Sequence, residues 1–358
     1  MAGLTHLVTH RKTIRDQVAL YPMVAFITLA YAFSFFWLLS FQIDLGWVNG
    51  FGILGSISPA LAAMIVSALL KPEQSGIPAS KRWQLFGRLG ILFLAVMAVL
   101  RFWNAAGLVS VSGIPATEIA YPTLTAFLMD VVAATAVAFI LSGVHSPRQG
   151  VRDLLQSLNP RQNRVRWTWW AIAVGLWPVV FILGNAISTA VGLPVPAITT
   201  AGEWYWLALD VFLTFLFFLF GGGGLEEPGW RGFALPLLLK RYSPLLSSLI
   251  LGVIWAFWHW PYAVSGGSPW LMIFFLQQCV PLAILFTAVY SRTRGSLLIA
   301  ILLHASINTT TFYLPESIVA TILWMLLCLG LAFWMWRFPH AFFTGHQVLP
   351  SNIQSSSS

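Results

Sequence analysis

Runs of about 20 apolar residues recur along almost the whole chain, and no other feature restricts the fold as strongly. A helix of about 20 apolar residues is long enough to cross the hydrocarbon core of a bilayer. Hydrophobic residues make up 58% of the 358 residues and charged residues only 8%, whereas soluble domains carry about 25% charged residues. The sequence therefore predicts an all-α, polytopic transmembrane helical bundle located in the cell membrane.

Ten apolar stretches are long enough to be spans. They are 22–41, 51–70, 89–109, 122–143, 168–189, 204–222, 245–263, 270–290, 296–313 and 316–336. Arg101 interrupts the third stretch. The sixth ends in the glycine run 221–224, which favours the end of a helix or a bend in it.

The positive charges test this count of spans. If the N-terminus is cytoplasmic, 18 of the 19 Lys and Arg residues, Arg231 among them, fall in cytoplasmic segments. The remaining one is Arg101, and the outer loops contain none. Positive charge gathers on the cytoplasmic side of membrane proteins in this way. We therefore expect ten spans with both termini cytoplasmic, and an N-terminal segment that is not cleaved as a signal peptide.

Five parts follow from these assignments. They are a cytoplasmic N-terminal segment (1–21), an N-terminal four-helix transmembrane part (22–143), a basic cytoplasmic connector (144–167), a six-helix membrane core (168–336) and a polar C-terminal tail (337–358), which we expect to be disordered. The net charge of +8 does not predict nucleic-acid binding, because the charges lie in short loops and form no basic stripe. Cys279 and Cys328 form no metal-binding pair and are expected to be buried.

Three short motifs place ionisable side chains within these apolar stretches. They are Glu226-Glu227-Pro-Gly-Trp-Arg231, His259 within Trp-His-Trp-Pro, and His304-x-x-x-Asn308. Each has a structural interpretation when taken alone: a helix cap, a hydrogen-bonded histidine and an interhelical polar clasp. Together they cannot all remain unsatisfied in lipid, so we expect them to converge around a shared water-filled cavity. Ionisable residues inside a membrane indicate a functional site by default.

Local spacing indicates how the first motif is arranged. Pro228 is compatible with a first helical turn, so a new helix is expected to begin at about 226–228. Glu227 and Arg231 are four residues apart and can pair on one helical face, which leaves Glu226 pointing elsewhere. A Glu and a His can activate a water, and a His and an Asn can donate to an oxyanion. This set of groups is sufficient for peptide hydrolysis.

The three motifs, in this order, resemble those of the CPBP family of CAAX proteases and bacteriocin-processing enzymes, which includes the type II CAAX prenyl endopeptidases. The family pattern is Glu-Glu-x-x-x-Arg, then aromatic-x-x-x-His, then His-x-x-x-Asn. It is matched here by 226–231, by Trp255 with His259, and by 304–308. The resemblance covers roughly 160–315 and does not include the first four spans. Trp255 stands where Phe is often found, and Pro228 stands where the family usually has another apolar residue.

The resemblance implies an intramembrane endopeptidase. By position, Glu226 would be the catalytic base and His259 its partner in activating water, while His304 and Asn308 would bind the oxyanion. Glu227 and Arg231 would orient the first motif's helix.

Family members are commonly labelled metalloproteases, although the mechanism can be written without a metal. Glu226, His259 and His304 would supply three zinc ligands if a metal were used. The absence of His-Glu-x-x-His and the presence of Asn308, a poor zinc ligand, favour a site without a cofactor, with zinc as the alternative.

Two other classes of function remain open at this stage. One is a non-catalytic membrane scaffold or bacteriocin self-immunity protein of the same family. The other is a transporter, although no matching pair of broken helices is visible in the two halves. The expected partners of the protease are membrane lipid and a membrane-tethered protein or peptide substrate, which is CAAX-like and prenylated or simply a peptide. Arg101, Asp130 and Asp210 are expected to have structural roles, with Arg101 and Asp130 as a pair.

Overall fold

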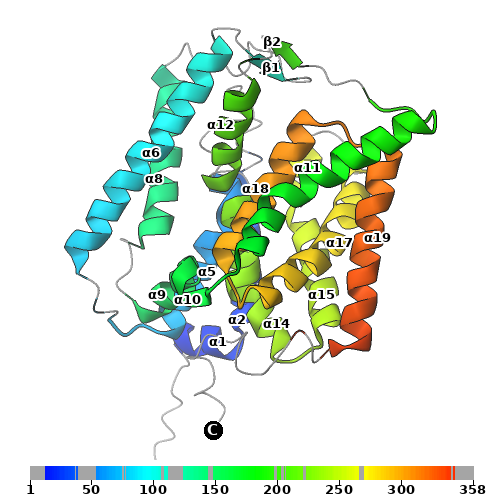
Figure 1. Cartoon of the computed structure of the whole chain (residues 1–358). Helices are drawn as coiled ribbons and strands as arrows, with labels where there is room; N and C mark the ends of the chain where they lie inside the picture. Colours follow the sequence, from blue (N-terminus) through cyan, green and yellow to red (C-terminus); the bar gives the residue numbers. More distant parts are fainter. Residues whose placement is uncertain are drawn as a thin grey trace, which may run out of the picture.

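A computed structural model describes residues 13–36, 54–74, 78–105, 109–111, 124–143, 148–196, 200–202, 207–220, 223–265 and 270–339, together with the isolated positions 38, 76, 205 and 342. The chain is a bundle of helices over these residues (Figure 1), which confirms the predicted all-α class. A small antiparallel ribbon of β1 (Val109–Val111) and β2 (Thr200–Gly202) lies at one end of the bundle.

Each of the ten predicted spans coincides with a helix. In chain order these helices are α2 (Pro22–Ser34), α5 (Ser58–Leu70), α6 (Ala79–Ala105), α8 (Leu124–Ser142), α11 (Trp167–Ala190), α12 (Leu207–Phe220), α15 (Pro244–Trp258), α17 (Leu271–Arg292), α18 (Leu297–Tyr313) and α19 (Ile318–Arg337). Among the described residues, 6 helices are long and apolar enough to cross a membrane, and α2 with the preceding α1 (Ile14–Leu20) forms a bent seventh candidate. The helices over Ser58–Leu70, Asp130–Ser142 and Leu297–Tyr313 are apolar but shorter. The protein is therefore a multi-pass membrane protein, and the count of ten stays a prediction.

The segments that were expected to be cytoplasmic lie together at one end of the bundle. They comprise α1, the connector helices α9 (Gln149–Gln156) and α10 (Pro160–Asn163), and the last turn of α19 (Figure 1). Helix α9 is fixed to the end of α5 by an ion pair of 3.0 Å between Lys71 Nζ and Asp153 Oδ2. The basic connector is thus part of the folded bundle.

Helix α12 ends at Phe220, next to the predicted end of the sixth span at residue 222, and a new α-helix begins at Glu227, within the predicted 226–228. After α12, helical structure resumes as a 3-10 turn (Gly224–Glu226), α13 (Glu227–Gly229), a π-helical turn (Trp230–Ala234) and α14 (Leu235–Leu239). The apolar segment therefore runs over Leu207–Leu239. The π turn immediately precedes α14, where Pro236 cannot donate the usual helical hydrogen bond. Such turns are rare and occur mostly as single turns inside helices, frequently at functional sites.

Arg231 consequently lies inside the bundle and not in a cytoplasmic segment. Its side chain is fully buried. An unpaired guanidinium would be very costly there, but the carboxylate of Glu227 lies one turn earlier on the same helical face. The number of Lys and Arg residues assigned to cytoplasmic segments therefore falls by one. The excess of positive charge on the cytoplasmic side keeps its direction.

The first helices support the motif helices from behind. A Cβ atom on Gly229 would lie 2.5 Å from backbone and side-chain atoms of Pro59, so α13 and α5 approach too closely for any side chain at this position. The indole Nε1 of Trp258 donates to the carbonyl of Ala30 (3.2 Å) and to Oγ of Ser58 (3.0 Å). The N-terminal part thus helps to position the motifs, although the family pattern does not include it.

Single-cysteine labelling tests the orientation of the bundle. The side chains of Arg161, in α10, and Val191, just after α11, are both exposed, while Cys279 and Cys328 are buried. We expect a membrane-impermeant maleimide to label Val191→Cys in intact cells and to label Arg161→Cys only after permeabilisation, because α10 lies at the Lys- and Arg-rich end. The reverse pattern would show that the bundle has the opposite orientation.

Candidate active site

The shared carboxylate of Glu227 joins the first motif to the third. Its Oε1 accepts from Nη1 of Arg231 at 2.9 Å and from Nδ1 of His304 at 2.6 Å. The pair between Glu227 and Arg231 that the four-residue spacing predicts is therefore present. Because α13 and α18 contribute opposite ends of this network, the carboxylate fixes the two helices relative to each other.

Aromatic rings enclose the guanidinium of Arg231. Its central carbon lies 4.5 Å from the ring centre of Trp255 and 4.1 Å from that of Phe286. Within the described structure, Nε and Nη2 of Arg231 and Oε2 of Glu227 are buried without a hydrogen-bond partner. The two cation–π contacts offset part of the cost of burying this charge.

Glu226 is bonded to two tryptophans, whereas Arg231 pairs with Glu227. Its Oε2 accepts one hydrogen bond from Nε1 of Trp255 at 2.7 Å and another from Nε1 of Trp230 at 3.2 Å. Both indoles bond the same oxygen, so Oε1 carries neither of these bonds. The side chain is only 5% exposed. The carboxylate is therefore held in a defined orientation by donors of two helical segments.

His259 caps the C-terminal end of α15, and the helix breaks there because Pro261 follows. Its Nδ1 lies 2.9 Å from the carbonyl oxygen of Trp255. A carbonyl can only accept, so Nδ1 carries the proton and Nε2 is the basic nitrogen of the neutral ring. The ring stacks on Phe275 with centres 4.2 Å apart and planes at 11°, which fixes its orientation.

Gly223 forms the contact between the glycine run and the third motif. Its φ of +85° is in the region that favours glycine. A Cβ atom at this position would lie 2.4 Å from Nδ2 of Asn308 and 2.7 Å from Nε2 of His304. These two nitrogens therefore lie side by side against the backbone of Gly223, as the spacing of four residues on α18 predicts.

Trp255 connects the three motifs at their centre. Its ring centre lies 5.5 Å from that of His304 and 6.2 Å from that of His259, and its indole N–H donates to Glu226. The sequence interpretation treated this residue only as a bulky aromatic. The sequence did contain a signal for this role. Trp255 has an indole N–H donor, and the Phe that the family pattern often has at this position does not.

The described residues contain no group of three or more His, Cys, Asp or Glu side chains arranged to hold a metal ion. The Oε2 of Glu226 is bonded to indoles, and Nδ1 of both His259 and His304 is bonded to oxygen. The choice between a site without a cofactor and the three-ligand zinc alternative stays a prediction.

Two of the remaining membrane charges are buried away from the motifs. The Tyr313 hydroxyl donates to Asp210 and lies 2.7 Å from Oγ1 of Thr214, so Asp210 links α12 to α18, as its structural interpretation predicts. Asp130 is completely buried. The side chain of Arg101 lies outside the described residues, and its pairing with Asp130 stays a prediction.

Comparison with known proteins finds similarity to one protease family over the part of the chain that carries the motifs. Residues 208–310 match the family described as type II CAAX prenyl endopeptidase Rce1-like, and this stretch contains all three motifs. CAAX prenyl protease 2 of Methanococcus maripaludis is 30% identical over 142 residues, which are 37% of this chain and 52% of that protein. The resemblance to the CPBP/CAAX protease family is thus supported over this stretch. The chain spans about half the length of the curated relative it matches.

The shared carboxylate predicts a marked loss of stability when it is removed. Glu227→Ala leaves Arg231 buried without a partner, and breaking a buried ion pair in this way costs about 3–5 kcal/mol. We expect a lower thermal unfolding midpoint in detergent than for wild type or for Glu73→Ala, which changes an exposed carboxylate. The double variant Glu227→Ala/Arg231→Met should recover stability, because it leaves no unpaired guanidinium. A double variant that is less stable than Glu227→Ala would contradict this account.

Proposed function

We propose that the chain is an intramembrane endopeptidase that hydrolyses a peptide bond in a membrane-associated substrate through a water activated by Glu226 and His259. The observation that carries this proposal is the convergence on Trp255 and Gly223 of a buried carboxylate, two histidines and an amide. Burying such a set in a membrane protein costs stability, and residues of this kind inside a membrane usually mark a functional site. The match of residues 208–310 to a protease family supports the same conclusion.

Glu226 is suited to the role of general base. The two indole bonds hold Oε2, so Oε1 is the oxygen that would accept the proton of an attacking water. The basic Nε2 of His259 would orient that water, because Nδ1 is committed to the Trp255 carbonyl. A base must reach its proton directly or through one water, and burial strengthens these interactions by excluding bulk solvent.

His304 and Asn308 would stabilise the negative charge that develops on the carbonyl oxygen. The Nδ2 of Asn308 is a donor in any protonation state. The Nδ1 of His304 already bonds Glu227, so Nε2 can donate only when the ring is doubly protonated. The bond to Glu227 also fixes the orientation of the His304 ring, so this second glutamate positions the oxyanion site although it does not touch the substrate.

The atoms of the proposed reaction balance without a cofactor. The water oxygen forms a bond to the substrate carbonyl carbon while its proton passes to Glu226. The tetrahedral intermediate then collapses, the C–N bond breaks, and the proton on Glu226 is delivered to the leaving amine. One water is consumed and the carboxylate is regenerated.

The proposed substrate is a protein or peptide tethered to the membrane, with a CAAX-like C-terminus that carries a prenyl group. The match to a protein named CAAX prenyl protease 2 supports this class. The depth of the site supports it also, because the Glu226 motif lies within the apolar segment Leu207–Leu239, where a lipid-tethered chain can be presented.

The decisive experiment compares Glu226→Gln with wild type. Gln keeps an oxygen for both indole bonds and removes the base, so cleavage of a farnesylated CAAX peptide in membranes should fall to background while the protein stays folded. Glu316→Gln is the matched control, because Glu316 also accepts from an indole, Nε1 of Trp324 at 2.7 Å, away from the motifs. Equal cleavage by Glu226→Gln and Glu316→Gln would refute the role of Glu226. A wild-type chain that cleaves neither the farnesylated peptide nor its unlipidated counterpart would favour the scaffold or self-immunity alternative.

A ranking of two variants separates the proposed oxyanion site from the support of the base. Asn308→Ala removes a direct donor to the transition state, which typically lowers turnover about 100- to 1000-fold. Trp255→Phe removes one of two donors to Glu226 and keeps the aromatic contacts, so we expect a loss of about tenfold. Single-turnover rates with one lipidated peptide measure both. A larger effect of Trp255→Phe than of Asn308→Ala would mean that Asn308 does not stabilise the oxyanion.

Chelation tests the metal-free mechanism. We expect purified protein to retain activity after exhaustive dialysis against a chelator and to contain less than one zinc per chain by elemental analysis. A zinc enzyme would lose activity, because the bound metal supplies the nucleophile by lowering the pKa of its water to about 7. Loss of activity that is restored only by zinc or cobalt would overturn this part of the proposal.

A further inference from the structure

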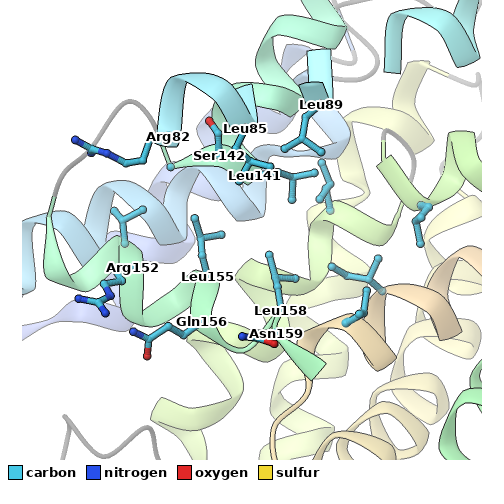
Figure 2. Close-up of a pocket in the computed structure, with 16 residues that line it drawn as sticks. Arg82, Leu85, Leu89, Leu141, Ser142, Arg152, Leu155, Gln156, Leu158 and Asn159 are labelled. Atoms are coloured by element: carbon cyan, nitrogen blue, oxygen red, sulfur yellow. The ribbon is translucent and has the colours of Figure 1, made fainter. Parts of the chain in front are cut away.

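A separate cavity of about 600 Å³ lies between the pair of helices α6 and α8 and the rest of the bundle. Figure 2 shows Leu85, Leu89 and Leu141 on one side of it and Leu155 and Leu158 on the other. Its volume is in the range of pockets that enclose small ligands, which are about 300–1,000 Å³. None of the three catalytic motifs lines it, so it is not the cavity of the proposed active site.

The polarity of this cavity changes from one end to the other. Arg82 of α6 and Arg152 of α9 lie toward the same side (Figure 2). The remaining wall is mostly leucine, and it includes Leu225 and Ile301, which belong to the segments that carry Glu226 and His304. No acidic side chain is among the described residues that line it. The cavity is therefore basic at one end and apolar toward the motif helices.

Arg82 is incompletely satisfied by the protein. Its Nε and Nη1 atoms are inaccessible to solvent and have no hydrogen-bond partner among the described residues. A buried charged donor without an acceptor is costly, and a guanidinium is well matched to the oxygens of a phosphate. Among the described residues, these two nitrogens of Arg82 thus have no acceptor, and an anion at the basic end would supply one.

We propose that this cavity binds an acyl chain of an anionic phospholipid, with the phosphate at Arg82 and Arg152 and the chain directed toward Leu225. The position supports this occupant, because Arg82 lies in the first turn of α6, at the end of the bundle that holds α9 and α10 (Figure 1). Basic pockets between membrane helices on the cytoplasmic side bind anionic lipid headgroups. The lipid would fill the space between α6, α8 and the core.

The direction of the polarity gradient excludes the lipid group of a substrate as the intended occupant. A lipid attached to the peptide under cleavage would begin at the catalytic residues and extend away from them as pure hydrocarbon. Here the end near Glu226 is apolar, and the distant end is cationic. A molecule with an anionic head and an apolar tail fits that order, and a tail that ends in hydrocarbon at two arginines does not.

Lipid-dependent thermal stability of the purified, delipidated full-length chain tests the proposal, and this readout does not depend on proteolytic activity. Phosphatidylglycerol is compared with phosphatidylcholine of identical acyl chains and with inorganic phosphate. We expect phosphatidylglycerol alone to raise the unfolding midpoint. Arg82→Gln and Arg152→Gln should each raise its half-saturating concentration about fivefold, because one basic residue near a lipid headgroup contributes about 1 kcal/mol.

Two further variants make the result specific. Arg88→Gln changes an exposed arginine on the same helix that does not line the cavity, and it should respond to phosphatidylglycerol as wild type does. Leu141→Trp fills the cavity without changing charge, and it should fold but lose the response. Equal stabilisation by phosphatidylcholine or by phosphate, an equal loss in Arg88→Gln, or a full response in Leu141→Trp would each overturn the proposal.

Discussion

One buried carboxylate organises the membrane core. Oε1 of Glu227 bonds both Arg231 on its own helical segment and His304 on α18. The side chains of Glu227 and Arg231 have no surface exposed to solvent. An interaction of this kind is weak evidence for stability, since desolvation offsets much of the attraction. Its value lies in position: the two helices cannot slide past each other without leaving a charge unpaired in an apolar environment. The register between the first and third motifs is therefore fixed before any substrate arrives.

The rest of the site is arranged around that register by groups that need no rearrangement during a reaction. Indole N–H groups orient Glu226, a backbone carbonyl selects the tautomer of His259, and a glycine backbone seats the His304–Asn308 pair. Preorganised dipoles of this type stabilise charge more effectively than water, which must reorient. Helices α2 and α5, which the family pattern does not cover, hold this arrangement from behind through Trp258 and Pro59.

Hydropathy and the motifs were sufficient to predict the class of fold, the match to a CAAX protease family and the Glu227–Arg231 pair. These features depend on periodicity and spacing along one helix, which a sequence displays directly. The new helix at about 226–228 was predicted from Pro228, whereas the 3-10 and π-helical turns on either side of it have no signal in the residue spacing. The central role of Trp255 was also missed, since its contacts to Glu226 and His304 arise only when three separated segments meet.

The two indoles that donate to Oε2 of Glu226 restrict which substitutions homologous chains can accept at positions 230 and 255. Trp230 and Trp255 are 25 positions apart in the chain, yet each supplies a donor to one oxygen atom. A chain that exchanges one of them for Phe keeps its packing and places the whole task on the other, and a chain that exchanges both must orient its glutamate by some new donor. Substitutions at these two positions are thus physically coupled, and homologous chains should retain at least one tryptophan at this pair wherever no other hydrogen-bond donor replaces it.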